Sequence, residues 1–322
     1  MEWFQRERFC VTGGVGALGS RLVKRLLDYG ARQVIIFDQR YPLSNNHVLK
    51  DGAVQYVISN ILEQAELIRT LNNCTTVFHL AALTHASHSQ IDPIRYLEVN
   101  GLGTARVLEA CRLGGVRQVI YASTSHVYGI PRELPVSEDH QTMPLSVYAA
   151  SKLAGEVAIQ GYVTSCELSA TVARLSNVYG APFGPDTVIG RGLDQIAAGG
   201  PIQLRNLTAV RDFIYVDDVV EALVRLATIK HESTKLHLVN VCTARGISIY
   251  ELAHTLVMIA ERHGFGRREI LTTDEPLQEK IPALILDNSR LKELTGWLPQ
   301  VSLEEGLAFS LRERMGQEAE QV

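Results

Sequence analysis

Short apolar runs alternate with longer amphipathic stretches over the first half of the chain. The apolar runs lie at residues 8–12, 33–37, 54–59, 76–80 and 116–122, and amphipathic stretches lie at 20–29, 63–71 and 92–113. Short apolar runs are typical of buried strands, and apolar positions spaced three and four apart are typical of helices. The alternation predicts an α/β fold, with a doubly wound parallel sheet of the Rossmann type covered by helices on both faces.

The regular alternation ends after Tyr179. There the chain reads Gly-Ala-Pro-Phe-Gly-Pro, and glycine and proline both interrupt regular structure. A strand-like run at 213–216, a helical stretch at 217–228 and a strand-like run at 236–241 follow. We expect a Rossmann domain of residues 1–178 with returning segments at about 212–244, and a smaller C-terminal substrate-binding lobe of residues 179–211 and 245–322.

A glycine-rich turn joins the first predicted strand to the first predicted helix. Gly13, Gly16 and Gly19 have the spacing that lets the backbone approach a pyrophosphate at a helix N-terminus. Asp38 ends the next strand about 20 residues on, where an acid binds ribose hydroxyls and repels a 2′-phosphate. This context predicts NAD, although Arg40 leaves a phosphate contact open. The expected cofactor-binding residues are Gly13, Gly16, Ala17, Leu18, Gly19, Asp38, Gln39, Asn60, Ile61, Leu80, Ala81, Ala82 and Lys152.

Thr124, Tyr148 and Lys152 are the candidate catalytic residues. Tyr148 and Lys152 stand four apart in a helical stretch and so project from one face, and Thr124 follows a strand-like run. A free phenol titrates near ~10, and a neighbouring ammonium favours the phenolate. We therefore expect the pKa of Tyr148 to fall towards neutrality, with a nicotinamide cation adding to the effect. The alternative is an ordinary surface helix that carries the same two residues.

Other polar residues have simpler interpretations. We expect His79, which ends the fourth predicted strand, to be a packed histidine rather than a catalyst. His85 and His88 lie three apart without nearby acids or cysteines, so we expect no metal site there. Asn100 lies inside a predicted helix and needs polar partners, and we expect it to brace Lys152 or the catalytic strand.

Composition excludes several classes of partner. The chain is 46% hydrophobic and 20% charged, with a net charge of −4 and no long basic run, which argues against nucleic-acid and anionic-membrane partners. Its five cysteines include no Cys-x-x-Cys pair, which is typical of buried thiols in a reducing compartment. The first residues contain no apolar signal core, and no run reaches the ~18 apolar residues of a membrane span. We expect a cytoplasmic protein.

Several motifs together resemble the extended short-chain dehydrogenase/reductases, in particular the NAD-dependent nucleotide-sugar epimerase/dehydratase family. The resemblance covers nearly the whole chain. It rests on Thr12-Gly-Gly-Val-Gly-Ala-Leu-Gly19, His79-Leu-Ala-Ala82, Ser123-Thr-Ser-His-Val-Tyr-Gly129, Tyr148-Ala-Ala-Ser-Lys152, Arg174-Leu-Ser-Asn-Val-Tyr-Gly180, Arg211-Asp-Phe-Ile-Tyr-Val-Asp-Asp218 and Gly296-Trp-Leu-Pro299.

The resemblance implies a nucleoside-diphosphate sugar as substrate. By the motif match, Asn177 and Arg211 would meet the diphosphate, which suits a guanidinium. Thr84, Ser125 and His126 would lie on the sugar side. The implied reaction is oxidation at the sugar C4, with Tyr148 as the base and Thr124 assisting.

The step after oxidation separates the possible activities. A 4-epimerase returns hydride to the opposite face of a transient 4-keto sugar, whereas a 4,6-dehydratase or uronate decarboxylase needs another proton-transfer group. Those enzymes usually carry a carboxylate just after the catalytic threonine, where this chain has Ser125 and His126. We therefore expect a nucleotide-sugar 4-epimerase. The alternative is a dehydratase or decarboxylase that uses His126 as its acid/base. A non-catalytic NAD-binding scaffold is the weakest of the three hypotheses.

Two departures from the family pattern concern the substrate. Uronate 4-epimerases usually place an arginine near the position of Gly184, which argues mildly against a uronic acid. A second diphosphate arginine that often precedes Asp287 has no clear counterpart here, so Arg205, Arg267 or Arg268 could replace it. By analogy with the family, helices at 92–113 and 148–165 would form a homodimer.

Overall fold

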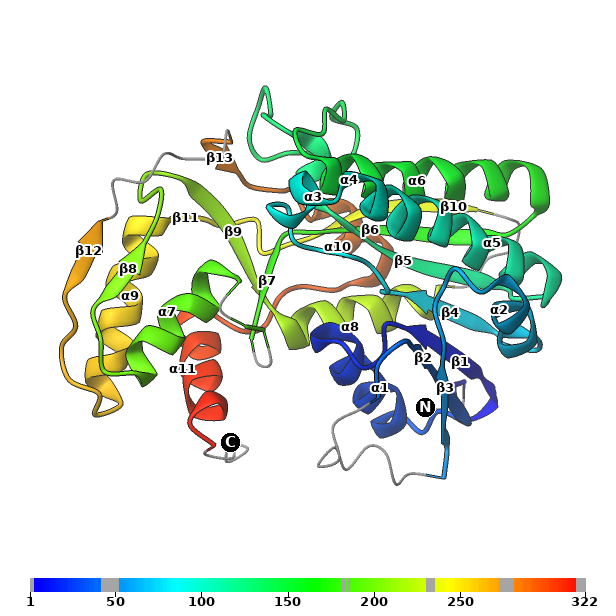
Figure 1. Cartoon of the computed structure of the whole chain (residues 1–322), viewed down its shortest axis with the longest axis horizontal. Helices are drawn as coiled ribbons and strands as arrows, with labels where there is room; N and C mark the ends of the chain where they lie inside the picture. Colours follow the sequence, from blue (N-terminus) through cyan, green and yellow to red (C-terminus); the bar gives the residue numbers. More distant parts are fainter. Residues whose placement is uncertain are drawn as a thin grey trace.

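The computed structural model describes residues 3–41, 52–180, 183–184, 186–229, 235–272 and 281–316. A seven-stranded parallel sheet with the order β10–β6–β5–β4–β1–β2–β3 forms the centre of the larger lobe (Figure 1). Its strands are β1 (Arg8–Thr12), β2 (Gln33–Asp38), β3 (Val54–Ile58), β4 (Thr76–His79), β5 (Gln118–Thr124), β6 (Ser169–Leu175) and β10 (Leu236–Val241). The order reverses between β1 and β4, where ligands bind in open α/β sheets.

Helices cover both faces of this sheet, as predicted. On one face α1 (Ala17–Asp28) and α8 (Val216–Ala227) share a buried apolar core with the sheet. On the other face α2 (Gln64–Leu71), α5 (Gly103–Leu113) and α6 (Val147–Cys166) do the same. The predicted Rossmann-type fold is therefore confirmed. Within the described ranges, no helix combines the length and the apolar character needed to cross a bilayer.

Two elements differ from the expected pattern. Strand β6 was not anticipated, because Ser169-Ala-Thr-Val-Ala-Arg-Leu175 has no continuous apolar run, yet every residue of it is buried between β5 and β10. The helix expected at 92–113 is divided into α4 (Pro93–Tyr96), a π-helical turn (Leu97–Leu102) and α5. Such π-turns occur frequently at functional sites.

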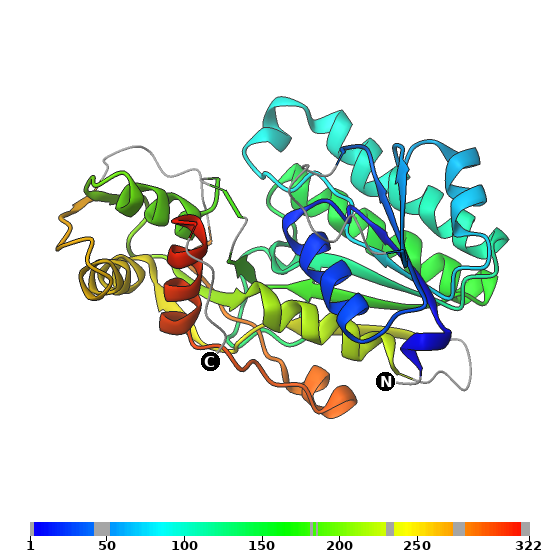
Figure 2. The ribbon, with the colours of Figure 1, turned by 90° about the horizontal axis from the view of Figure 1, so that it is seen from below.

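The smaller lobe lies beside the carboxyl ends of the large sheet. Figure 2 shows the two lobes side by side, with the C-terminal helix in the smaller one. Its strands are β7 (Asn177–Tyr179), β9 (Val210–Tyr215), β11 (Gly246–Ser248), β13 (Ala283–Leu284), and the pair β8 (Ile202–Leu204) and β12 (Ile270–Thr272). Its helices are α7 (Val188–Ala197), α9 (Ile249–Arg262) and α11 (Leu303–Arg314), which pack around a third apolar core.

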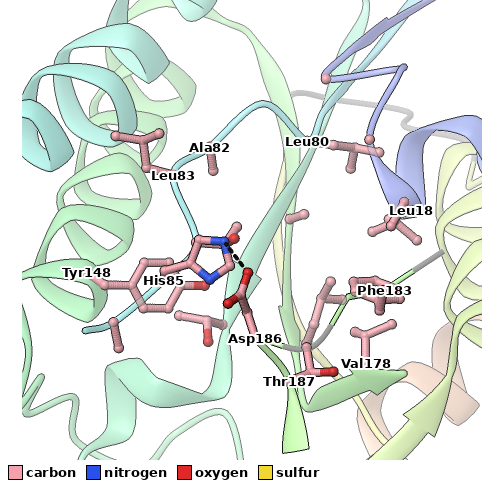
Figure 3. Close-up of a pocket in the computed structure, with 18 of the residues that line it drawn as sticks. Leu18, Leu80, Ala82, Leu83, His85, Tyr148, Val178, Phe183, Asp186 and Thr187 are labelled. Carbon is pink, nitrogen blue, oxygen red and sulfur yellow. Dashed lines mark ion pairs between the residues drawn. The ribbon is translucent and has the colours of Figure 1, made fainter. Parts of the chain in front are cut away.

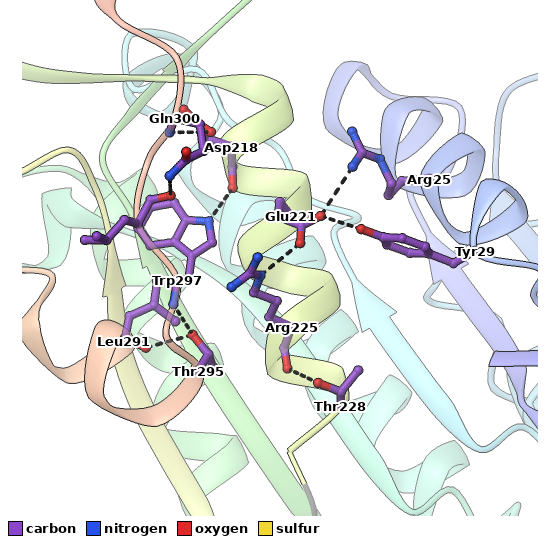
Figure 4. A network of polar contacts seen from close by, with 11 residues as sticks. Arg25, Tyr29, Asp218, Glu221, Arg225, Thr228, Leu291, Thr295, Trp297 and Gln300 are labelled. Atoms are coloured by element: carbon purple, nitrogen blue, oxygen red, sulfur yellow. Dashed lines mark hydrogen bonds and ion pairs between the residues drawn. The ribbon is translucent and has the colours of Figure 1, made fainter. Parts of the chain in front are cut away.

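The chain crosses between the lobes at places that differ from the expected boundaries. Strand β9, in the segment expected to return to the large domain, pairs with β7, β11 and β13 instead. Conversely, Trp297 follows α10 (Ser289–Thr295) and packs in the core of the larger lobe. Its indole N–H donates to the carbonyl of Asp218 at 3.2 Å, in a network that joins α8 to α1 through Glu221 (Figure 4).

Candidate active site

A cavity of about 1440 Å³ opens between the two lobes at the carboxyl ends of β1, β4 and β5. Residues from both lobes line it. Figure 3 shows Tyr148, Leu83 and His85 of the larger lobe facing Asp186 and Thr187, while Leu18 lies near Phe183 and Val178. The topology explains this position, because the strand order reverses at this edge of the sheet.

The glycine-rich turn between β1 and α1 has the shape that a dinucleotide phosphate requires. Gly13 has φ +74°, and a Cβ there would lie 2.8 Å from the backbone nitrogen of Ala81. A Cβ at Gly19 would collide with the carbonyl oxygen of Gly13. The N-terminus of α1 carries no acidic residue in its first turn and points into the cavity, so its N–H groups can bind an anion. The turn therefore fits the pyrophosphate of NAD.

Asp38 holds this turn in place from the end of β2. Its carboxylate accepts hydrogen bonds from the backbone N–H of Val15 at 3.1 Å and of Arg40 at 3.0 Å. Arg40, which sequence left open as a phosphate contact, pairs its guanidinium with Asp38 at 3.4 Å. Asp38, Arg40 and Gln39 all line the cavity. An acid at this position suits the ribose hydroxyls of NAD.

Asn100 clamps the loop after β4 to helix α6. Its side chain accepts from the N–H of Leu83 at 2.8 Å and donates to the carbonyl of Leu83 and the hydroxyl of Ser151, each at 2.9 Å. Asn100 lies in the π-helical turn and is buried. It therefore braces the neighbour of Lys152, and it also fixes the loop that carries Leu80, Ala81, Ala82 and Thr84 along the cavity.

Thr124, Tyr148 and Lys152 meet at the cavity wall. Thr124 is the last residue of β5, while Tyr148 and Lys152 come from the first two turns of α6. Ser146 caps the N-terminus of α6, and its hydroxyl accepts from the N–H of Ala149 at 3.1 Å. The Lys152 ammonium lies 4.1 Å from the ring centroid of Tyr121 and is buried. The arrangement is able to move a proton between a substrate hydroxyl and the Tyr148 phenol.

The expected fall in the pKa of Tyr148 does not occur in the chain itself. Burial raises the pKa of the Tyr148 phenol, and the opposing influence is its hydrogen bond with Thr124 rather than the charge of Lys152. Burial also lowers the pKa of Lys152 to about 7, with Glu156 opposing this change. Desolvation outweighs the pairwise attraction that the sequence argument considered. The expected fall in the pKa of Tyr148 was wrong because the spacing along a helix does not show how deeply a side chain is buried.

His79 is a structural residue, as expected. Its two ring nitrogens bond the hydroxyls of Thr12 at 2.7 Å and Thr104 at 3.0 Å, and it is buried. Burial and, secondarily, the charge of Lys152 lower its pKa to about 3. It is therefore a neutral crosslink between β1, β4 and α5 at physiological pH.

The smaller lobe contributes Asn177 and Arg211 to the opposite wall. Arg211 is buried in β9 and donates to the carbonyls of Ile281 at 2.7 Å and of Val210 at 2.8 Å. Asn177 donates to the carbonyl of Asp212 at 3.1 Å, which ties β7 to β9. Both residues line the cavity. Arg211 is thus held at the cavity by the backbone of β9 and of the segment before β13.

Two further arginines line the smaller lobe's side of the cavity. Of the three candidates to replace the missing diphosphate arginine, Arg205 lies in the lining, whereas Arg267 and Arg268 lie outside it. Arg191 also lines the cavity, and sequence analysis did not identify it. The feature that could have identified Arg191 is its place in the first turn of α7, just after the capping residue Thr187.

A contact between His85 and Asp186 spans the cavity between the lobes. Nε2 of His85 lies 3.8 Å from the carboxylate of Asp186 (Figure 3). The rings of His85 and His88 lie 5.2 Å apart. The backbone carbonyl of His85 accepts a hydrogen bond from Tyr96 at 2.7 Å. Among the described residues, no group of three or more His, Cys, Asp or Glu has a metal-binding arrangement. Both residues of the pair line the same cavity as Tyr148.

The structure brings nearly all of the candidate residues together. The lining includes the predicted cofactor residues, the three catalytic candidates, and Thr84, His126, Asn177 and Arg211. The ring of His126 lies 6.3 Å from that of Tyr148. Ser125 differs, because it is buried in the short 3-10 helix Ser125–Tyr128 and lies outside the lining.

Comparisons with known proteins agree with this geometry. A model of the NAD dependent epimerase/dehydratase family matches residues 9–242. A UDP-glucose 4-epimerase of Mycolicibacterium smegmatis is 35% identical over 310 residues, which cover 94% of this chain and 96% of that protein.

Two solved structures are similar over almost their whole length. The Thermotoga maritima UDP-glucose 4-epimerase with UDP-glucose has a TM-score of 0.85 and 29% identity, covering 97% of this chain and 100% of that one. The Streptomyces venezuelae dTDP-glucose 4,6-dehydratase DesIV, with NAD bound, has a TM-score of 0.86 and 25% identity, covering 96% and 97%.

Proposed function

Because the chain belongs to the NAD dependent epimerase/dehydratase family, we propose that it is an NAD-dependent nucleotide-sugar 4-epimerase. The family expected from the motifs is thereby confirmed. We further propose a UDP-hexose as the substrate, since the relatives named above include UDP-glucose 4-epimerases. This step from relatives to substrate is supported by similarity over nearly the whole chain.

The observation that carries the proposal is one cavity with three kinds of residue along it. A glycine-rich turn suited to a dinucleotide lies at one end, Thr124 and Tyr148 lie at the wall of the larger lobe, and Arg211 lies at the wall of the smaller lobe. A nucleotide sugar that held its diphosphate near Arg211 could present its sugar to Tyr148. The described residues after Thr124, namely Ser125 and His126, supply no carboxylate for dehydration.

Each residue of the chain has a defined task in this reaction. The glycine-rich turn and Asp38 would hold NAD, which would supply a reversible hydride acceptor for the sugar C4. Tyr148 acts as its phenolate, a form that positive charge from Lys152 and from the nicotinamide of bound NAD favours. The phenolate takes the C4 hydroxyl proton, and the hydrogen bond between Thr124 and Tyr148 orients its oxygen. Lys152 provides positive charge from a buried position, and Arg211 and Asn177 hold the diphosphate. Epimerisation requires no further proton-transfer group.

A dehydratase is the second candidate, for one reason. His126 lines the cavity with its ring 6.3 Å from that of Tyr148, at the position where a second acid/base would act. A structurally similar protein is a 4,6-dehydratase. The epimerase remains favoured because a histidine stands there in place of the usual carboxylate.

Product analysis distinguishes the candidates. The enzyme would be incubated with UDP-, dTDP-, GDP- and CDP-sugars that include both hexoses and uronic acids, and the products separated by chromatography and weighed by mass spectrometry. We expect a UDP-hexose to yield a C4 epimer of unchanged mass. A product lighter by one water or one carbon dioxide, lost in the His126→Ala variant, would establish the second candidate. No turnover with NAD retained would favour a non-catalytic role.

We also propose a homodimer formed by the helices beside the site. Ile94, Leu97, Leu102 and Val157 are exposed on α4, the π-helical turn and α6, with 63%, 43%, 50% and 62% of their surface accessible. These elements pack against one another on one side of the larger lobe. Exposed apolar side chains on adjoining helices are typical of an interface. Light scattering should give twice the chain mass, and Val157→Lys should shift it towards the monomer.

A further inference from the structure

A buried ion pair lies directly behind the catalytic residues. Glu156 and Arg174 have only 8% and 5% of their side-chain surface exposed, and Nη2 of Arg174 lies 2.6 Å from the Glu156 carboxylate. Nε of Arg174 adds contacts at 3.1 Å and 3.3 Å to the two carboxylate oxygens. A buried pair of this kind has a large desolvation cost and is weak evidence for a stabilising role. Its place relative to the site suggests another role.

The pair touches the catalytic strand one residue before Thr124. The hydroxyl of Ser123 donates a short hydrogen bond to Glu156. Ser123 and Arg174 are direct neighbours in the sheet, as are Thr124 and Leu175. Glu156 therefore joins the ends of β5 and β6 to helix α6 at the level where Thr124 reaches the cavity.

The same carboxylate lies one helical turn beyond Lys152. Residues four apart share a helix face, so Glu156 and Lys152 both project from α6 towards β5. Gly155 lets the helix approach, because a Cβ there would collide with the hydroxyl of Tyr121. Tyr121 in turn donates to the carbonyl of Lys152 at 3.2 Å. The spacing between helix and strand is thus fixed at the Lys152 turn.

Titratable groups on α6 and on three strands of the sheet lie near this turn of the helix. Tyr148 and Glu156 come from α6, Tyr121 from β5, His79 from β4 and Arg174 from β6. Burial raises the pKa of Tyr121 and lowers that of His79, so both are neutral near pH 7. Glu156 is the group whose charge opposes the fall in the pKa of Lys152.

We propose that Glu156 is a positioning residue of the active site, which acts through Lys152 and Ser123 rather than on the substrate. Its charge keeps Lys152 protonated in a buried position, and its hydrogen bond with Ser123 fixes the neighbouring Thr124. Arg174 holds the Glu156 carboxylate in place. This inference rests on the epimerase function proposed above.

The test is the pH dependence of Glu156→Gln in the full enzyme with NAD. Removing the negative charge lowers the pKa of Lys152 further. The alkaline limb of the pH profile of kcat should therefore move to lower pH by about one unit. At pH values above the limb, kcat should then be about tenfold lower than in the wild type. We expect KM and NAD content to stay within about twofold. A uniformly lower kcat with an unmoved limb would indicate a merely structural role and overturn the proposal.

Two further variants keep the test decisive. Ser123→Ala removes only the hydrogen bond, so kcat should fall about two- to tenfold without moving the limb; an unchanged kcat would overturn the positioning of Thr124. If Glu156→Gln fails to fold, the double variant Glu156→Gln/Arg174→Met removes both buried charges. Its limb should move in the same direction but by less, because loss of the Arg174 charge partly offsets loss of the Glu156 charge. Glu66→Gln, which removes an exposed pair with Arg69 on α2, is the matched control.

A substrate-independent readout separates this inference from the proposed function. Lys152 can be followed by NMR of [¹³C]lysine-labelled enzyme, with its signal assigned by its loss in Lys152→Met. Its titration midpoint should be about one pH unit lower in Glu156→Gln than in the wild type. This shift in an enzyme that turns over no nucleotide sugar would reject the epimerase assignment and support the role of Glu156. An unshifted midpoint would reject that role.

Discussion

The two walls of the cavity hold their polar side chains in different ways. On the larger lobe, Tyr148 and Lys152 lie on a long helix supported from behind by a buried ion pair and a parallel sheet. On the smaller lobe, Arg211 lies on a short strand and is held by backbone carbonyls. The first wall consists of a helix packed on a parallel sheet, and the second is assembled from segments distant in sequence.

This difference matches the tasks of the two walls. Proton transfer requires the reacting atoms within hydrogen-bond reach, which a packed sheet and helix can maintain. Holding a diphosphate requires correctly placed positive charge and tolerates more variation in the supporting segments. We therefore expect changes on the larger lobe to affect kcat and changes on the smaller lobe to affect substrate binding.

The largest expected effect is on the catalytic wall. Tyr148→Phe removes the hydroxyl that transfers the proton, so kcat should fall about 10²- to 10⁴-fold, while NAD remains bound. Turnover would be measured with UDP-hexose, and NAD after denaturing the protein. Tyr162→Phe is the matched control on the same helix, since its hydroxyl bonds Glu109 outside the cavity. Equal turnover of Tyr148→Phe and wild type would remove Tyr148 as the base.

The second effect concerns the junction of the lobes. Burial raises the pKa of Asp212 to about 6, although Thr243 and Ser176 bond its carboxylate. Because the folded-state pKa lies above the unfolded one, its contribution to stability is complete below about pH 4 and is lost as pH rises through about 6. Relative to wild type, Asp212→Asn should therefore gain about 3 kcal/mol of unfolding free energy between pH 4 and pH 7.

Urea unfolding at several pH values measures this gain. Asp28→Asn, on the exposed end of α1, controls for the loss of one carboxylate. A constant difference between Asp212→Asn and wild type across the pH range would show that Asp212 ionises normally in the folded protein.

The third effect is on the binding wall. Arg211→Ala removes charge-assisted hydrogen bonds to the diphosphate, so the Kd for UDP should rise about 10- to 100-fold without loss of NAD. Calorimetry measures the Kd. Arg268→Ala is the matched control, because Arg268 also donates to a backbone carbonyl, that of Gly199, and lies outside the cavity. An unchanged Kd for Arg211→Ala would exclude it from the diphosphate site.

The smallest expected effect concerns the contact between the two walls of the cavity. The His85–Asp186 pair is partly exposed, and such pairs contribute about 0.2–1 kcal/mol. His85→Ala and Asp186→Ala should therefore each raise KM less than about fivefold, with a coupling energy in that range from a double-mutant cycle. A much larger coupling would mean that the two walls act as one unit during binding.

Much of the larger lobe could be predicted from local patterns. The glycine-rich turn, Asp38 and the Tyr148–Lys152 spacing indicate their roles because each depends on residues close together in sequence. Strand β6 was missed because its burial comes from its neighbours β5 and β10 rather than from its own composition. The division of the helix at 92–113 was missed because a π-turn has no simple apolar period.

The smaller lobe was less predictable for the same reason. Arg191 and Asp186 reach the cavity only through the packing of α7 and the loop before it. Ser125 was expected at the sugar, but the 3-10 turn after β5 buries it. In both cases the direction of a side chain depends on contacts between distant segments.

The sequence by itself determined the α/β class, the dinucleotide turn and the three catalytic candidates, since these follow from short-range periodicity and spacing. It also indicated the family, through the resemblance of its motifs. Only the tertiary structure decided the electrostatics of the site. Burial raises the pKa of Tyr148 and lowers that of Lys152, against the expectation from their spacing alone. The physical reason is that desolvation depends on everything packed around a group, whereas spacing along a helix reports only one neighbour.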